Sequence, residues 1–228
     1  MEAGSQSSWD RPDVVAGFTS TPPNAELMRF AELDRLRMGS DPVALDLGCG
    51  AGRNAVPLAQ QGWRVIGVDT SLPMVHAAVR RASEHGVHRR MHVAVAPMDQ
   101  LPVRDRSCDL LVAHGIWNLA RSHAELRRAL TEAARVSKVG AGLFVFTFSR
   151  TTLPPEAQPL AGETVVFTQF AGQPQCFLTA EQLVSELADV SFTPDPGVPL
   201  TELNRPQTKA LQVQTVPVIY QGAFRYRR

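Results

Sequence analysis

A glycine-rich turn that directly follows a short apolar run is the first feature of this sequence that could do chemistry. The run Val43–Leu47 holds one carboxylate, Asp46, and leads into three glycines at alternate positions, Gly48, Gly50 and Gly52. Glycines at such a turn let the chain bend tightly and let a ligand approach bare backbone. A dinucleotide fingerprint needs a small residue where this chain has Arg53, so the spacing argues against a dinucleotide.

Two further carboxylates follow later apolar runs. Asp69 stands about 20 residues after the glycines, where an acidic side chain can accept hydrogen bonds from both hydroxyls of a ribose. Asp99 follows the next run, where a carboxylate can accept from the exocyclic amine of adenine. Taken alone, each aspartate is also explained as a helix N-cap or a turn residue. The prediction of a nucleotide-like ligand therefore depends on their order along the chain.

The elements that must position these residues alternate between strands and helices. Apolar runs predict strands at 43–47, 64–68, 91–96, 109–113 and 143–148, with two closing strands at 190–193 and 213–220. Helical spacing predicts helices at 53–61, 71–85 and 124–138. This alternation predicts an α/β fold, with a Rossmann-like, mostly parallel, seven-stranded sheet and helices on both faces.

The chain divides into an N-terminal segment and a main domain. Residues 1–42 are expected to form a lid segment and a helix that begins at Asn24, a favourable N-cap residue. Residues 43–228 are expected to form the main domain. An insertion at about 150–178 is rich in Pro, Gly and Thr, with one strand-like stretch at 164–170, and an insertion of this length is usually functional or disordered.

A last helix is expected after the insertion. Thr179 and Gln182 have the spacing of a capping box, which predicts a helix over 179–188. The basic end at 225–228 is expected to be a solvated tail.

Composition excludes several classes of protein. The 228 residues carry a net charge of +1, from 23 basic and 22 acidic side chains, which is not the footprint of a nucleic-acid binder. The three cysteines, Cys49, Cys108 and Cys176, show no metal or disulfide spacing. The first residues lack a signal peptide, and no run reaches the ~20 apolar residues of a membrane helix. We expect no metal, no nucleic-acid or membrane partner, and a cytoplasmic location.

Five segments, in order, resemble the motifs of the class I S-adenosylmethionine (SAM) dependent methyltransferases. They are Leu45–Gly52, Val65–Ser71, Met98–Pro102, Cys108–Trp117, and the helix and turn Arg135–Gly142 with the strand after it. Val139 stands where the turn of the last motif often has Pro, which is a minor departure. The resemblance covers about residues 43–148.

The resemblance implies SAM as the cofactor and assigns residues to it. The glycines Gly48, Gly50 and Gly52 would line its methionine and ribose parts, with Asp46 near the amine and Asp69 on the ribose. The residues expected at the adenine are Thr70, Met74, Met98 and Asp99. The backbone of His114 would meet the methionine part of the cofactor.

The methyl acceptor is expected to be a small molecule. The Asn/Asp-Pro-Pro-Tyr/Phe signature of nucleic-acid amino-methylating enzymes is absent after the fourth strand, where Ala113–Ile116 stands instead. A looser similarity to thiol, thiopurine and tellurite methyltransferases implies transfer to sulfur, selenium or tellurium. O- or N-methylation of a natural product or metabolite is the alternative, and such an acceptor needs a base to take its proton. The protein is expected to be a monomer or a homodimer.

Residues of the loops beyond the strands are candidates for the acceptor site. His114 and Trp117 are the candidate catalytic residues. The candidate substrate contacts are Trp9, Phe18, Asn24, Trp117, Asn118, Arg150 and Phe170. Each has a structural alternative: His114 as a local hydrogen-bonding residue, Trp117 as a cover of the core, and Arg150 as a solvated charge.

Two other functions compete with methyl transfer. The first is a nucleotide-dependent oxidoreductase, which Arg53 disfavours. The second is a catalytically silent SAM-fold module. The intact acidic and glycine positions make this second function less favoured, although binding of a cofactor does not prove turnover.

Overall fold

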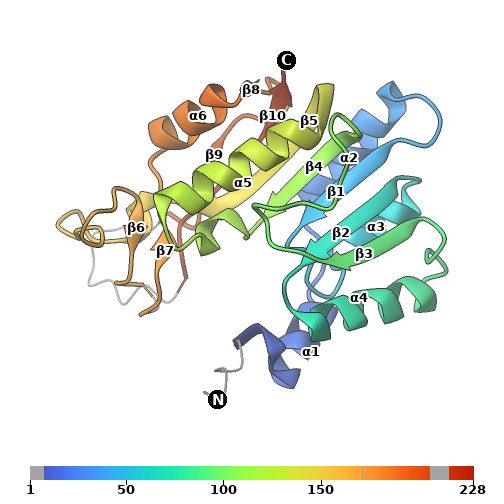
Figure 1. Ribbon diagram of the computed structural model, residues 1–228, viewed down its shortest axis with the longest axis horizontal. Helices are drawn as coiled ribbons and strands as arrows, with labels where there is room; N and C mark the ends of the chain where they lie inside the picture. The colour runs from blue at the N-terminus through green and yellow to red at the C-terminus, as the bar shows by residue number, and fades with distance from the viewer. Residues whose placement is uncertain (1–7, 171, 206–215) are drawn as a thin grey trace.

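One twisted sheet forms the centre of the computed structural model, which describes residues 8–170, 172–205 and 216–228. Seven strands run in the order β3-β2-β1-β4-β5-β10-β8, and an eighth strand, β9, pairs with β10 (Figure 1). The strands are β1 (Val43–Leu47), β2 (Arg64–Asp69), β3 (Met91–Val95), β4 (Cys108–His114), β5 (Ser137–Phe148), β8 (Phe192–Pro194), β9 (Thr201–Leu203) and β10 (Ile219–Tyr226). The first five are parallel, and β10 is antiparallel to each of its partners. The predicted Rossmann-like, mostly parallel sheet is confirmed, with one strand more than expected.

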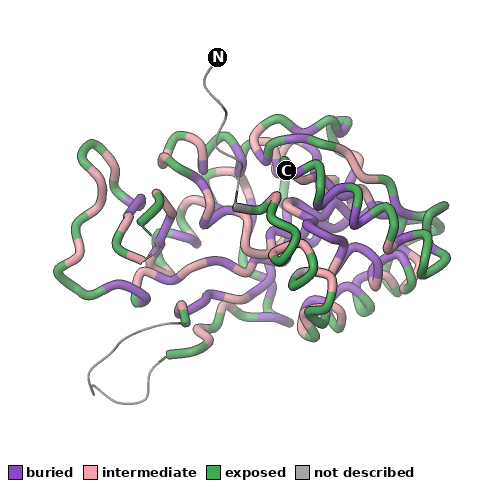
Figure 2. The backbone as a smooth tube through the Cα atoms, turned by 90° about the horizontal axis from the view of Figure 1, so that it is seen from below, coloured by how far each residue is buried: buried purple, intermediate pink, exposed green. Residues whose placement is uncertain are grey.

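Helices cover both faces of this sheet, because successive strand residues point to opposite sides. In β4, Leu110 and Val112 join the core cluster that holds residues of α2, α3 and α4. Leu111 and Ala113 join the cluster that holds residues of α5 and α6. Figure 2 shows the buried stretches gathered in the interior and the exposed ones along the outer turns. The helices are α2 (Ala25–Arg37), α3 (Ala55–Gln60), α4 (Leu72–Glu84), α5 (His123–Val136) and α6 (Ala180–Asp189).

Side-chain caps fix where several of these helices begin. The Asn24 side chain accepts a hydrogen bond from the backbone N–H of Leu27, which starts α2 as predicted. Thr179 and Gln182 form the predicted capping box at the start of α6. Ser71 caps α4 directly after β2, so this strand end and helix start are held within a few residues of each other.

The N-terminal segment packs against α4. It contains a 3-10 helix, η1 (Ser8–Asp10), and a short helix, α1 (Pro12–Ser20), which lies beside the start of α4 (Figure 1). Val14 and Val15 of α1 contact the small core cluster around Met74. The segment expected to be a lid therefore lies next to the carboxyl end of β2.

The insertion contains less strand than expected. The stretch predicted at 164–170 forms only β6 (Val166–Phe167), which pairs with β7 (Gln175–Cys176) as a separate two-stranded sheet. A cluster of phenylalanines packs beneath these strands and holds the insertion to the end of β5. The core of the insertion is thus aromatic and is separate from the main sheet.

The boundary between α5 and β5 differs from the prediction. The helix expected to reach Lys138 ends at Val136, and β5 begins at Ser137 without an intervening turn. Lys138 is instead a strand residue whose ammonium group pairs with Asp109 of β4 at 2.7 Å. This ion pair between neighbouring strands is a tertiary contact, which helix periodicity does not reveal.

The basic end of the chain is a solvated tail only in part: Arg227 and Arg228 are exposed, but Arg225 is not. Arg225 lies in β10, where its guanidinium pairs with Asp34 of α2 and with Asp195. Both carboxylates are buried, so the expectation of a free tail is wrong at Arg225. The closing strand predicted at 213–220 is also displaced: β10 runs from Ile219 to Tyr226, and residues 213–215 lie outside the described part of the chain.

Candidate cofactor site

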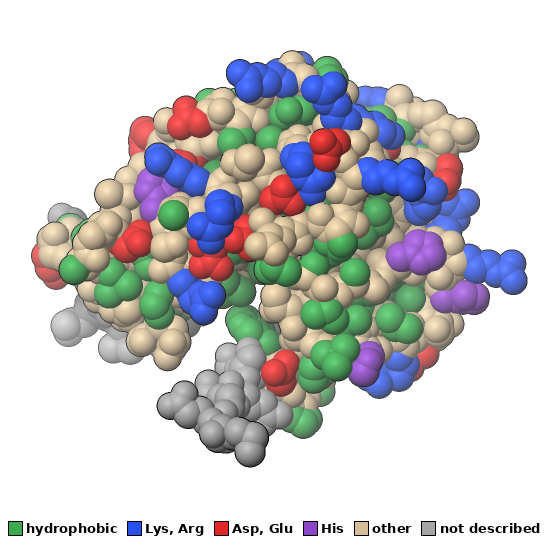
Figure 3. Space-filling view, in the orientation of Figure 1, with side chains coloured by type: hydrophobic (Ala, Val, Ile, Leu, Met, Phe, Trp, Pro, Cys, Tyr) green, Lys and Arg blue, Asp and Glu red, His purple; other side chains and the backbone are tan. Residues whose placement is uncertain are grey.

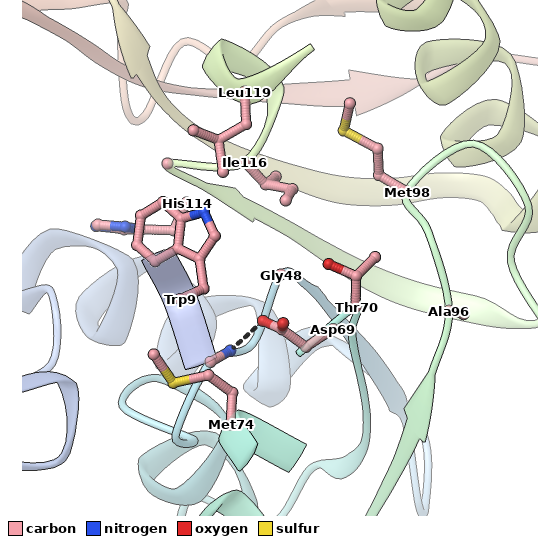
Figure 4. A pocket seen from close by; sticks show the side chains of 12 residues that line it. Trp9, Gly48, Asp69, Thr70, Met74, Ala96, Met98, His114, Ile116 and Leu119 are labelled. Carbon is pink, nitrogen blue, oxygen red and sulfur yellow. Dashed lines mark hydrogen bonds between the residues drawn. The ribbon is translucent and has the colours of Figure 1, made fainter. Parts of the chain in front are cut away.

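A pocket lies at the carboxyl ends of β1, β2 and β4, where parallel sheets usually bind ligands (Figure 4). The space between its atoms amounts to about 620 Å³, part of which is open to solvent. Figure 3 shows the surface hollowed between the part that holds β6 and β7 and the part that holds α4. The pocket is lined by Trp9, Gly48, Gly50, Asp69, Thr70, Met74, Ala96, Met98, His114, Gly115, Ile116 and Leu119.

The glycine turn forms the floor of this pocket. Gly48 and Gly50 line it, and both have positive φ, 65° and 52°, which side-chain-bearing residues rarely adopt. A Cβ atom on Gly48 would lie 2.7 Å from Cδ1 of Ile116. Gly52 does not line the pocket; a Cβ atom there would instead touch Val56 and Met91 at 3.4 Å. The first two glycines thus keep the pocket open, and the third allows close packing of the turn.

Asp69 projects from the end of β2 and is held in place by backbone groups. Its Oδ2 accepts from the N–H of Gly50, and its Oδ1 accepts from the N–H of Ser71, each at 2.9 Å. Each carboxylate oxygen has a second lone pair, so both can still accept from a ligand. The geometry fixes a charged acceptor pair in the pocket, next to Thr70.

Asp46 is a buried carboxylate with a free acceptor. Its side chain is 2% exposed, and its Oδ2 has no hydrogen-bond partner. Burial, together with the charge of Asp69, raises the pKa of Asp46 to about 7, and Arg53 opposes this change. A buried polar atom without a partner is costly. A cationic ligand group that paired with Asp46 would remove this cost.

His114 ends β4 and is held by three neighbours. Its ring stacks on Phe146 with centroids 4.1 Å apart. Nη2 of Arg53 lies 2.8 Å from Nδ1, and Nδ2 of Asn24 lies 3.3 Å from Nε2. Burial and then the charge of Arg53 lower the pKa of His114 to about 3. The imidazole is therefore neutral and weakly basic at physiological pH.

Apolar side chains from separate segments form the walls of the pocket. Met74 of α4 and Met98 after β3 are both buried, and Trp9 of the N-terminal segment lines the same pocket (Figure 4). The hydroxyl of Ser71 donates to Asp10 at 2.7 Å, which ties the segment that carries Trp9 to the start of α4. The walls suit the flat, largely apolar face of a nucleobase.

Asp99 does not line this pocket, unlike the other residues expected at the adenine. Its Oδ2 accepts from Nε of Arg128 on α5 at 3.0 Å. The side chain lies in the turn after β3 but faces α5, while its neighbour Met98 faces the pocket.

The candidate acceptor residues after β4 are also turned away from the pocket. Trp117 belongs to the core cluster and is 1% exposed, so it covers the core. Asn118 is buried beside it, in the short helix η2 (Trp117–Leu119). The lining residues of this loop are apolar or glycine, namely Gly115, Ile116 and Leu119. No polar residue type in the sequence marks them, which is why they were not predicted.

Arg150 and Phe170 organise the insertion. The guanidinium of Arg150 donates to four backbone carbonyls between Leu153 and Ala157 and stacks over the ring of Phe167 at 4.9 Å. Phe170 packs edge-on against Phe148 with centroids 5.5 Å apart. Asn24 does not line the pocket itself but contacts His114, which does, and the side chain of Phe18 is outside what the structure describes.

The fold and this pocket are those of a Rossmann-like protein, and the lining of the pocket suits a nucleoside ligand. Among the described residues, no group of three or more His, Cys, Asp or Glu could hold a metal ion, and no helix is long and apolar enough to cross a membrane. The residues present fit SAM. A free buried carboxylate, Asp46, matches its ammonium group; Asp69 matches its ribose; and Gly48 leaves room where a Cβ atom would intrude.

Comparison with known proteins agrees with this class. The family described as a methyltransferase domain matches residues 44–140. A demethylmenaquinone methyltransferase of Thermobifida fusca is 28% identical over 200 residues, which cover 79% of this chain and 82% of the relative. Another, of Lactiplantibacillus plantarum, is 32% identical over 130 residues. Those residues cover 55% of this chain and 53% of the relative, so the match spans about half of that relative's length.

Solved structures share the fold. A SAM-dependent methyltransferase of Methanosarcina mazei has a TM-score of 0.69 at 20% identity, covering 91% of this chain and 99% of the other. The 1,6-didemethyltoxoflavin-N1-methyltransferase of Burkholderia thailandensis, with S-adenosylhomocysteine bound, has a TM-score of 0.63 at 19% identity, covering 88% and 78%. The chain is thus similar to SAM-dependent methyltransferases over residues 44–140 and shares their fold, in agreement with the resemblance of its motifs.

Proposed function

We propose that this protein transfers the methyl group of SAM to a small-molecule acceptor. The observation that carries the proposal is the pocket at the carboxyl ends of β1, β2 and β4, with Asp69 fixed in it by two backbone N–H groups. When bound, SAM supplies a methyl group on a positively charged sulfur. Asp46 would hold its ammonium group, Asp69 its ribose hydroxyls, and Met74 and Met98 its adenine. The N-terminal segment with Trp9 would act as a lid that limits water.

The acceptor is proposed to attack without giving a proton to a side chain of the pocket. Among the lining residues, the ionisable side chains are Asp69 and His114. Asp69 accepts from two backbone N–H groups and is assigned to the ribose hydroxyls, and His114, with a pKa of about 3, is a weak base. A thiolate or another soft chalcogen nucleophile needs little help from a base. This supports sulfur, selenium or tellurium as the acceptor atom.

Methylation of another atom of a natural product is the alternative acceptor chemistry. The relatives named above are demethylmenaquinone methyltransferases, and one structural neighbour is named as an N1-methyltransferase of 1,6-didemethyltoxoflavin. An acceptor that must lose a proton would depend on water or on a group outside the lining described above. Methylation of a chalcogen and methylation of another atom can be distinguished by identifying the compounds that accept a labelled methyl group from SAM.

A cyclase is the second candidate function. A SAM-dependent Diels-Alderase from Neonectria is 26% identical over 181 residues, covering 75% of this chain and 69% of the relative. The [4+2]-cyclase SpnF has a TM-score of 0.59 at 23% identity, covering 77% of this chain and 59% of the other. Among the described residues that line the pocket, Asp69 and His114 are the ionisable ones, and this lining also suits a reaction that moves no proton.

A screen with methyl-labelled SAM tests the proposal. Thiols, selenite and tellurite species, halides, phenols and amines are offered to the protein and to Asp69→Ala, and both labelled product and S-adenosylhomocysteine are measured. Methyl transfer predicts equal amounts of both with one class of acceptor, and little of either with the variant. SAM binding without S-adenosylhomocysteine formation for every class would reject methyl transfer and favour the cyclase or the silent module.

A further inference from the structure

The edge of the main sheet at β3 lies outside the cofactor pocket and is open. The strand order ends at β8 on one side and at β3 on the other (Figure 1). β8 has three residues and ends in Pro194, whereas β3 has five residues and pairs with β2 without a bulge. Proline, bulges and charged residues within an edge strand prevent further strands from pairing with it. β3, with the sequence Met-His-Val-Ala-Val, has none of these, so a further strand can pair with it.

Alternate residues of β3 direct their backbone groups away from the sheet. The C=O of Arg90, just before β3, accepts from β2 at 2.7 Å, and the N–H of Ala96, just after it, donates to β2 at 3.1 Å. Because pairing alternates along a parallel strand, the even-numbered residues between them also pair with β2. The odd-numbered residues direct their N–H and C=O groups outward, and these are Met91, Val93 and Val95.

Positive charge is concentrated around this edge. Residues 72–95, which form α4, β3 and the turn between them, hold four arginines, four of the six histidines and one acidic residue, Glu84. With neutral histidines their net charge is +3, whereas the whole chain carries +1, so the remaining residues carry −2. Figure 3 shows histidine and basic side chains gathered over the part that holds α4 and β3. The open edge therefore lies in a positive region of a nearly neutral protein.

Few carboxylates neutralise the arginines of this region. Arg90 shares Asp41 with Arg64 of β2, at 3.3 and 3.6 Å, so one carboxylate faces two guanidinium groups. Arg89, two residues before β3, is exposed, and in the described part of the chain no carboxylate lies within 4.0 Å of its guanidinium. His92 of β3 is exposed as well. The complement of this edge is an extended segment that carries negative charge.

We propose that the edge of β3 binds an extended acidic segment of a partner protein, which adds to the sheet as a further strand. The backbone of the segment would pair with the outward groups of β3, and its carboxylates would face Arg89 and His92. A second copy of this chain is disfavoured as the partner, because symmetric pairing of two β3 edges would bring two positive regions together. This interaction does not depend on methyl transfer.

Hydrogen exchange of the wild-type protein with a model peptide tests the added strand. The probe is a short peptide of alternating Glu and Val, and the matched control peptide has Lys in place of Glu. The acidic peptide should slow exchange at the outward amides of Met91, Val93 and Val95. It should leave the amides of His92 and Ala94, which already pair with β2, unchanged. Equal protection by both peptides, or by neither, overturns the proposal.

Two substitutions separate backbone pairing from charge in calorimetric titrations with the acidic peptide. Val95→Pro removes an outward N–H at an exposed position and should weaken binding by at least about 10-fold, whereas Val95→Thr keeps the N–H and should bind as the wild type does. Arg89→Glu should weaken binding by roughly 5-fold, and Arg104→Glu, at an exposed arginine outside this region, should not.

Unchanged affinity in a folded Val95→Pro protein overturns the addition of a strand. If that variant is unfolded, the exchange pattern of the wild type and the effect of Arg89→Glu decide the question. Vesicles of phosphatidylglycerol test the other anionic partner. Vesicle binding that Arg89→Glu weakens, without protection of the outward amides by the acidic peptide, would assign the region to a lipid surface and overturn the proposal.

Discussion

The buried carboxylate of Asp46 should make the stability of the protein depend on pH. Its pKa is raised from the ordinary 3.8 to about 7, mainly because burial disfavours the charge. Since each pKa unit corresponds to 1.36 kcal/mol, ionising Asp46 in the folded state costs about 4 kcal/mol. Between these two pKa values the folded state holds a proton that the unfolded state has lost. The contribution of Asp46 to the free energy of unfolding is therefore largest below about pH 4 and is lost as pH rises through about 7.

The variant Asp46→Asn removes the charge and nearly keeps the shape. With these two pKa values, ionisation of Asp46 lowers the free energy of unfolding of the wild type by about 1.7 kcal/mol at pH 5 and by about 4.3 kcal/mol at pH 8. Relative to the wild type, the free energy of unfolding of Asp46→Asn should thus rise by about 2.6 kcal/mol from pH 5 to pH 8. His114 has a depressed pKa and destabilises the fold as pH falls below its ordinary value of 6.5, but it does so in both proteins and cancels.

Urea unfolding at pH 5, 6, 7 and 8, without cofactor, measures this difference. Parallel stability curves for the wild type and Asp46→Asn would refute the argument that Asp46 is buried without a compensating partner. Calorimetry adds a test through the ligand. Binding of S-adenosylhomocysteine at pH 6 should release a proton from the wild type and none from Asp46→Asn, as seen from heats measured in buffers of different ionisation enthalpy.

Three further changes have expected outcomes. Asp69→Ala should weaken SAM binding by about 1.5–3 kcal/mol for each ribose hydrogen bond lost, and unchanged affinity in a folded variant would remove Asp69 from the site. Gly48→Ala forces positive φ on alanine and places Cβ against Ile116. Calorimetry should therefore show that SAM binding is lost, and the free energy of unfolding should fall by about 1–2 kcal/mol. Arg225→Met removes the guanidinium that pairs with two buried carboxylates and should lower the free energy of unfolding in urea by about 3–5 kcal/mol, whereas a cost below 1 kcal/mol would mean that the end of β10 is solvated.

Features that depend on neighbours in the sequence could be predicted well. The cap at Asn24 and the capping box of Thr179 and Gln182 involve residues three positions apart, and each is present. The strand before the glycine turn has the predicted bounds, Val43–Leu47, because an apolar run between turn residues encodes its own limits. The order of the motifs then fixes which strand ends meet at the pocket.

Long-range ion pairs could not be predicted in this way. Arg225 and Asp34 are 191 positions apart, and only the antiparallel placement of β10 brings them together. Asp99 stands at the expected place after β3, yet its side chain faces Arg128 of α5. Arg150 occupies the loop after β5 as expected, but the carbonyls of its own loop occupy its donors. A charged side chain binds the partner that tertiary structure brings to it, and residue type does not specify that partner.

The role of His114 shows the same limit at the centre of the site. Its place at the end of β4 made it a candidate base, and the pocket does include it. A base needs a free nitrogen and a pKa near the working pH. Here Arg53 occupies Nδ1, Asn24 faces Nε2, and burial lowers the pKa to about 3. These neighbours come from the glycine turn and from α2, so position in the chain could mark His114 as a site residue but could not decide between a base and a local hydrogen-bonding residue. The tertiary contacts decide this question, and they favour the local hydrogen-bonding residue.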